Sequence, residues 1–137
     1  IGSESLHSYN VIVRDITFNK ATRVLWLKMR PDTPQHYEYI RLERLKGNSG
    51  SFLVIRPWTQ FYDLKDRADL PRSYSDHITL RRCKLTCDIY KDVELQPEQY
   101  ELQDFVFEEM EVVEKSPEKA PRLDDMNGHV YWSETRQ

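Results

Sequence analysis

The sequence predicts an all-β protein, folded as a small closed or partly open antiparallel barrel, with a β-sandwich as the alternative. Three observations lead to this fold class. Short segments of branched and aromatic residues recur between turn signals, long amphipathic helical patterns are hard to find, and 137 residues suit one hydrophobic core.

Four strands are expected in the first half of the chain, close enough in sequence to form an antiparallel meander. Pro31 and Pro34 end the second of them, because proline cannot donate to a strand ladder. The run from Gly47 to Gly50 is a hairpin signal before the fourth. The four expected strands span residues 9–18, 23–30, 37–46 and 51–56.

The second half of the chain is less regular. Residues 57–76 are rich in polar breakers, and residues 77–90 then form a long expected strand. Its apolar residues change parity at Arg81–Arg82, which predicts a β-bulge. Residues 102–113 fit a strand or a helix. We find no internal repeat.

These elements place one all-β domain at residues 1–115. Residues 116–137 form an acidic, polar tail, with a possible docking strand at residues 129–132. The amino-terminal residues lack the apolar core of a signal peptide, and no apolar run is long enough to span a membrane. The spacing of Cys83 and Cys87 along one strand is too wide for a disulfide, so we expect reduced thiols in an intracellular protein.

The net charge of −3 hides a strong asymmetry. Residues 1–82 hold 14 basic and 9 acidic side chains, a net charge of +5, whereas residues 83–137 hold 6 and 14, a net charge of −8. An acidic tail on an ordinary surface explains this pattern, and so does a basic binding face with acid placed elsewhere.

No catalytic motif is present, so we expect a non-enzymatic protein. There is no activated nucleophile motif, no glycine-rich phosphate loop and no cofactor signature. The four histidines, His7, His36, His77 and His129, stand far apart in sequence, and neither cysteine forms a CxxC pair. We therefore expect no metal and no cofactor.

Aromatic and basic residues alternate on the expected strands of the first half. In residues 37–46, Ile40 and Leu42 should face the core, which turns Tyr39 and Arg41 outward. Rings interleaved with arginine and lysine suit single-stranded nucleic acid, and they suit protein interfaces equally well. Burial in the core is the alternative for any one ring. The expected binding residues are Trp26, Lys28, Tyr39, Arg41, Arg44, Lys46, Arg56, Trp58, Phe61 and Tyr62.

Residues 24–56 also resemble a known family. The segment EYIRLERLK at residues 38–46, a turn, and SFLVI at residues 51–55 are similar to strands of the telomere-end-protecting OB-fold proteins. The resemblance implies an OB-like barrel, a nuclear location and single-strand binding. It places Arg41, Arg44 and Lys46 on the family's basic strand. Where the family has histidine, this chain has Glu43.

The sequence thus predicts an OB-like binding module, a subunit of a nuclear nucleic-acid-associated complex. Its expected partners are a protein and, as a second candidate, single-stranded DNA or RNA, and no membrane is expected. The alternative is a β-sandwich of the immunoglobulin or C2 type that binds proteins without contacting nucleic acid. A sandwich that binds carbohydrate or lipid head groups through Trp26, Trp58 and Trp132 is a third interpretation.

Overall fold

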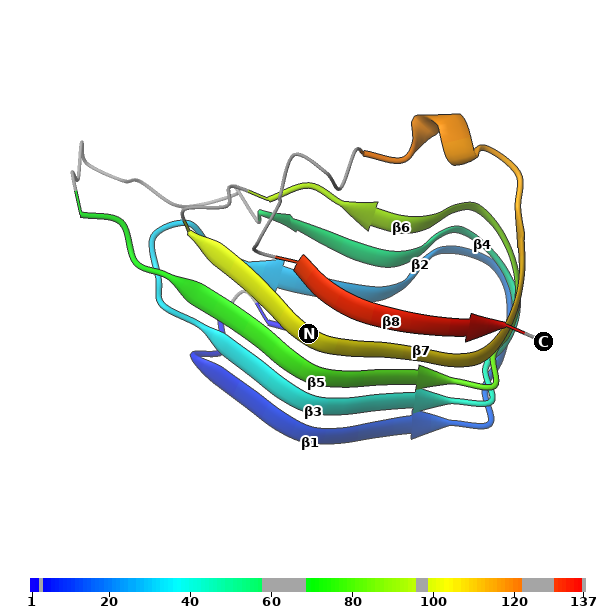
Figure 1. Cartoon of the computed structure of the whole chain (residues 1–137), viewed down its shortest axis with the longest axis horizontal. Helices are drawn as coiled ribbons and strands as arrows, with labels where there is room; N and C mark the ends of the chain where they lie inside the picture. The colour runs from blue at the N-terminus through cyan, green and yellow to red at the C-terminus, as the bar shows by residue number, and fades with distance from the viewer. Residues whose placement is uncertain (3, 58–68, 96–98, 122–129, 137) are drawn as a thin grey trace.

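In the computed structural model, the described residues form eight β-strands in one curved sheet, and each of their strand pairings is parallel (Figure 1). The structure describes residues 1–2, 4–57, 69–95, 99–121 and 130–136. The strand order is β1-β3-β5-β7-β6-β4-β2, with β8 paired to β7 beside that path. The strands are β1 (His7–Arg14), β2 (Thr17–Met29), β3 (His36–Glu43), β4 (Lys46–Pro57), β5 (Ser73–Arg81), β6 (Lys84–Val93), β7 (Tyr100–Glu114) and β8 (Val130–Arg136).

The all-β content agrees with the sequence prediction, but the antiparallel arrangement is wrong. The sheet is an all-parallel half-barrel rather than an OB-like antiparallel barrel or an immunoglobulin- or C2-like sandwich. The reason is visible at the expected hairpin. Gly47 to Gly50 lie inside β4, which runs straight on between β2 and β6. Strands that follow one another in the chain therefore lie in different parts of the sheet.

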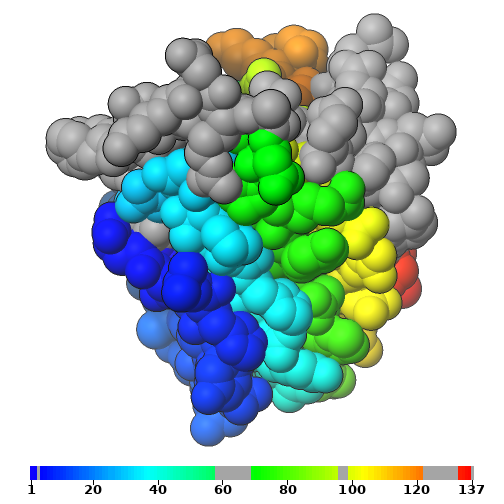
Figure 2. Space-filling view, turned by 90° about the vertical axis from the view of Figure 1, so that its left-hand side faces the viewer, coloured from blue at the N-terminus to red at the C-terminus, as the bar shows by residue number. Residues whose placement is uncertain are grey.

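Each pair of consecutive strands, beginning with β1 and β2, forms one complete turn of the chain. The first strand passes through a corner into the second, and the chain returns to start the next turn beside the previous one. We call these turns coil 1 (residues 7–29), coil 2 (36–57), coil 3 (73–93) and coil 4 (100–114), in which β7 supplies both arms. Figure 2 shows the first arms as neighbouring bands. Coils 2 to 4 bury their inward side chains against neighbouring coils, as in a solenoid.

Left-handed residues bend every coil at the same two levels. Equivalent residues of successive coils stack in columns. In two of these columns, every residue has a φ value between 52° and 58°. The first column bends the first arm, and the second makes the corner into the second arm. At Arg81–Arg82 this corner, with Arg82 in the left-handed conformation, takes the place of the expected bulge. The columns are Asn10, Tyr39, His77 and Asp104, followed by Asp15, Arg44, Arg82 and Glu109.

The core lies between the two arms of the half-barrel. In coils 2 to 4, the residues one, three and six positions after the first left-handed residue point inward and are at most 3% exposed. They include Cys83, whose thiol is free and buried, as is that of Cys87. The nine residues are Ile40, Leu42, Leu45, Ile78, Leu80, Cys83, Phe105, Phe107 and Met110.

Structure after coil 4 covers one end of the stack. A short 3-10 helix, η1 (Pro117–Lys119), follows β7, and β8 then pairs with β7. Glu134 of β8 also reaches Lys91 of β6, with 3.4 Å between the carboxylate oxygen and Nζ. The guanidinium of Arg136 lies 5.3 Å from the ring centre of Tyr90. β8 therefore contacts both arms. The described residues include no helix long and apolar enough to cross a bilayer.

Candidate functional site

Coil 1 exposes the side chains that the other coils bury. Its residues in the three inward columns are Val11, Val13 and Ile16, of which Val13 is 36% and Ile16 45% exposed. The equivalent residues of coil 2, Leu42 and Leu45, are 3% and 2% exposed. The residues compared are aliphatic in both coils, and they occupy equivalent positions of the backbone. The difference is that nothing in the described chain stacks on the outer side of these residues of coil 1.

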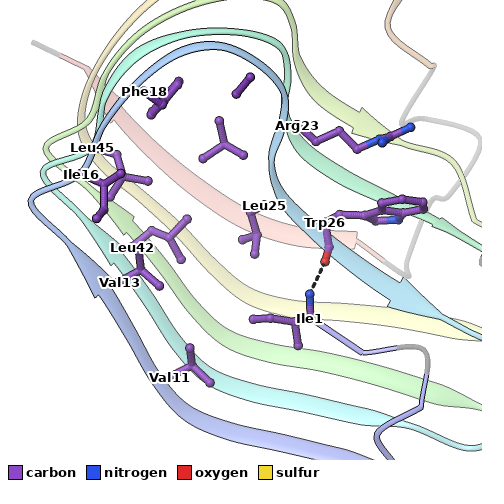
Figure 3. Close-up of a pocket in the computed structure, with 12 residues that line it drawn as sticks. Ile1, Val11, Val13, Ile16, Phe18, Arg23, Leu25, Trp26, Leu42 and Leu45 are labelled. Carbon is purple, nitrogen blue, oxygen red and sulfur yellow. Dashed lines mark hydrogen bonds between the residues drawn. The ribbon is translucent and has the colours of Figure 1, made fainter.

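These inward residues of coil 1 surround a cavity of about 340 Å³. Figure 3 shows Val11, Val13 and Ile16 on one side of the cavity and Leu25 of β2 on the other. Its floor includes Leu42 and Leu45 of coil 2. We call this region the open end, defined by Val11, Val13, Ile16, Phe18 and Leu25.

Two strand edges flank the open end. β1 and β2 are the two outermost strands of the sheet path, and both belong to coil 1. Among the described residues no strand of the sheet pairs with the outer edge of either one. An edge with unpaired N–H and C=O groups is a template for a further strand. The open end thus combines an apolar cavity with two available strand edges.

The amino-terminal residues occupy part of the β2 edge. Gly2 forms a parallel bridge with Lys28, whose N–H donates to the Ile1 carbonyl at 2.8 Å. The Ile1 nitrogen donates to the Trp26 carbonyl at 2.9 Å. Only glycine fits at residue 2, since a Cβ there would lie 1.9 Å from the Tyr37 hydroxyl. These contacts define the direction of a strand on this edge, which is parallel to β2.

The expected binding residues do not form one surface. Tyr39 is 52% exposed on the outer face of β3, and the Arg41 side chain is 54% exposed. Trp26 lies on β2, with the Lys28 Nζ and the Arg23 guanidinium each 4.4 Å from its ring centre. Lys46 begins β4 and is exposed. Trp58, Phe61 and Tyr62 lie outside the described residues.

Two of the expected arginines are held by carboxylates. Arg44 makes a two-point contact with Asp15, at 2.6 and 3.0 Å, and a further bond to Glu43. The hydrogen bonds that Arg44 donates to Asp15 raise the pKa of Arg44 and lower that of Asp15. Arg56 binds Asp92 and Glu94, and its pKa is raised chiefly by Asp92. Binding a phosphate would require these ion pairs to break.

A row of histidines and carboxylates crosses the outer face of the first arms. His7, His36 and Glu38 lie near Asp76 and His77, although they come from three coils. The hydrogen bond with Asp76, at 2.5 Å, raises the pKa of His77. Because the histidines stand far apart in sequence, their spacing does not predict this cluster. The structure brings three of them onto one face, because each coil begins at the same level of the stack.

Sequence reasoning also missed the open end. The sequence predicts that residues 9–18 form one strand of an antiparallel meander, whereas they include most of β1, the corner at Asp15 and the start of β2. One signal could have revealed the coils. Apolar residues recur one, three and six positions after Asn10, Tyr39, His77 and Asp104, in the same order each time.

Comparison with protein-family models, curated proteins and solved structures finds no match to this chain. The resemblance of residues 24–56 to OB-fold proteins is neither supported nor opposed by these comparisons, and function is inferred from the geometry alone.

Proposed function

We propose that this chain is a non-enzymatic protein-binding module whose open end docks a β-structured partner as a further parallel coil. The observation that carries the proposal is the exposure of Val13 and Ile16, whose equivalents in the three other coils are buried. Burial of an aliphatic side chain of this size contributes about 1.5–3 kcal/mol. A partner that covers both residues therefore gains affinity from apolar contacts of the same kind as those that hold coils 2 to 4 together.

The direction of the edge argues for a parallel partner rather than a second copy of the chain. Two copies related by a two-fold axis would pair their β2 edges antiparallel. The bridge between Gly2 and Lys28 is parallel and already occupies one end of that edge. A parallel strand pair with inward apolar residues, supplied by polypeptide other than these 137 residues, continues the pattern of the stack. This mode of binding is strand addition.

Binding of single-stranded nucleic acid stays a prediction without support from this geometry. Of the three arginines on which it depends, Arg44 and Arg56 are engaged by Asp15, Asp92 and neighbouring glutamates. The third, Arg41, is exposed and lies 3.9 Å from Glu43.

A peptide titration tests the proposal. The probe is a fluorescent peptide with the sequence of residues 36–57, which has the apolar pattern of a coil. We expect a saturable rise in its anisotropy with the wild-type chain, and slower hydrogen exchange at β1 and β2. Ile16→Asp should weaken binding about ten- to a hundredfold, since it removes one buried aliphatic contact.

The matched control is Val113→Asp, because Val113 is an exposed aliphatic residue of β7 outside the open end. It should bind the peptide like the wild type. Two results would contradict the proposal. One is equal binding by the Ile16→Asp variant. The other is a doubled mass of the wild-type chain in light scattering that Ile16→Asp abolishes, because a second copy would then be the occupant. Circular dichroism checks that both variants fold.

A further inference from the structure

We propose that His7, His36 and Glu38 form a binding site for a zinc-like divalent transition-metal ion on the outer face of coils 1 and 2. One ligand atom from each of the three residues lies within 4.8 Å of the other two. The site is separate from the open end, because its side chains point away from the core.

The strand register places these donors together. His7 and His36 are directly paired residues of β1 and β3, and their rings stack with centroids 5.4 Å apart. Glu38 lies two residues beyond His36, so both side chains are on the same face of β3. Its two oxygens reach both rings, with 3.5 Å from Oε1 to His7 Nε2 and 2.6 Å from Oε2 to His36 Nε2.

His36 Nε2 has more acceptors around it than one proton can serve. Glu38 Oε2 lies 2.6 Å from this nitrogen and Asp76 Oδ2 lies 2.5 Å from it. An imidazole nitrogen carries at most one N–H, and one N–H makes one hydrogen bond of full strength. Two carboxylates that converge on the same nitrogen repel each other. A divalent cation among these atoms would neutralise both carboxylates while bonding to neutral imidazole.

The donor set fits zinc better than a hard cation. Two histidine nitrogens and one carboxylate, with a fourth position left open, are the ligands of many zinc centres. Calcium and magnesium prefer ligand shells made of oxygen alone. In a tetrahedral site with bonds near 2.0 Å, ligand atoms are roughly 3.3 Å apart. His7 Nε2 lies 3.5 Å from Glu38 Oε1, which is close to this value. His36 Nε2 lies 2.6 Å from the other oxygen, Oε2, so a metal between them would need this separation to widen by about 0.7 Å.

Asp76 and His77 support the same site from coil 3. Asp76 approaches His36 with Oδ2, and its Oδ1 contacts His77 Nδ1 at 2.5 Å. A carboxylate fixed by a second histidine in this way is typical of the groups that surround a bound metal. Asp76 therefore adds negative charge beside His36, one of the three ligands.

Calorimetric titration of the chelator-treated chain with ZnCl₂ tests this proposal. We expect one saturable site per chain. His36→Ala and Glu38→Gln should each weaken zinc binding by at least about tenfold, because each removes a ligand. With CoCl₂ as the probe, the wild type should show the visible absorption of a four-coordinate site, and both variants should lose it.

The matched control is Glu101→Gln, since Glu101 lies on the same outer face two coils beyond His36 and outside the cluster. It should bind zinc like the wild type. His7 is on the edge strand and its side chain is 48% exposed, so His7→Ala provides a ligand deletion that should not disturb folding. The absence of saturable zinc binding in the wild type would overturn the proposal. Unchanged affinity in folded His7→Ala and Glu38→Gln variants would overturn it as well.

Discussion

Nine described residues other than glycine have a left-handed backbone, and all but Lys20 are arranged in the two columns that curve the sheet. Asparagine and aspartate tolerate this conformation, whereas other side chains cost roughly 1–2 kcal/mol there. Tyr39, Arg44, His77, Arg82 and Glu109 are of the costly kind. Their side chains recover part of this cost through contacts with neighbouring coils. Arg44 binds Asp15, and Tyr39 stacks on His77 with ring centres 4.6 Å apart.

Replacement of Asn10 by valine should destabilise the protein by about 1–2 kcal/mol or more, because a β-branched side chain is strained at φ 57°. Strand propensity alone predicts the opposite sign, since valine is favoured over asparagine in strands. The measurement is the free energy of unfolding in urea. The control is Thr79→Val, on the outer face of β5 at ordinary backbone angles. Equal effects of the two changes would contradict the assignment of strain to residue 10.

At the scale of elements, the strands themselves can be predicted but their partners cannot. Alternation of inward Ile40 and Leu42 with outward Tyr39 and Arg41 identifies β3, and the same alternation occurs in parallel and antiparallel strands. Turn chemistry was the only guide to direction, and it failed at Gly47, which lies inside β4.

The repeat was hidden for a physical reason. The corners are made by Asp15, Arg44, Arg82 and Glu109, and no glycine marks them. The residues of the first left-handed column are separated by 29, 38 and 27 positions, because the return segments between coils differ in length. The site residues were missed for the same reason, since His7 and His36 become neighbours only when the coils are in register.

Equivalent inward positions of the four coils are occupied by Val13, Leu42, Leu80 and Phe107. Truncation to alanine at two of these positions tests whether the open end is uncovered. Leu80→Ala should cost about 2–5 kcal/mol of unfolding free energy, as expected for a fully buried leucine. Val13→Ala should cost less than about 1 kcal/mol, because Val13 is already partly exposed and packs on one side only. Both values come from urea unfolding. A large loss for Val13→Ala would show that coil 1 is covered in the isolated chain.

For the whole molecule, the charge asymmetry of the sequence becomes attraction between coils. Arg81 and Arg82 of coil 3 face Glu108 and Glu109 of coil 4, with 3.4 and 2.5 Å between the charged atoms. Arg56 of coil 2 binds Asp92 in the same way. The basic and acidic parts of the chain therefore meet across the stack. Such exposed pairs contribute little stability each, but they favour this order of coils.

A stack of coils loses stability from its uncovered end, because each coil depends on its neighbours. Coil 1 should therefore open before coil 3, which lies between coils 2 and 4 and contains both thiols. Burial raises the pKa of the Cys83 thiol and raises that of Cys87 to about 11, so the reactive thiolate is scarce at pH 8. We expect thiol labelling with a disulfide reagent at pH 8 to be orders of magnitude slower in native buffer than in urea.

Ile16→Asp should speed hydrogen exchange in β1 and β2 and leave the rate of thiol labelling at Cys83 and Cys87 unchanged. Leu80→Ala, in contrast, should speed the thiol labelling. Unfolding of all coils in one step gives a different result. In that case Ile16→Asp would accelerate exchange and labelling by the same factor, because exposure of Cys83 would require the same event as exposure of β1. The two rates, measured side by side, decide whether the open end is an independent unit that a partner can order.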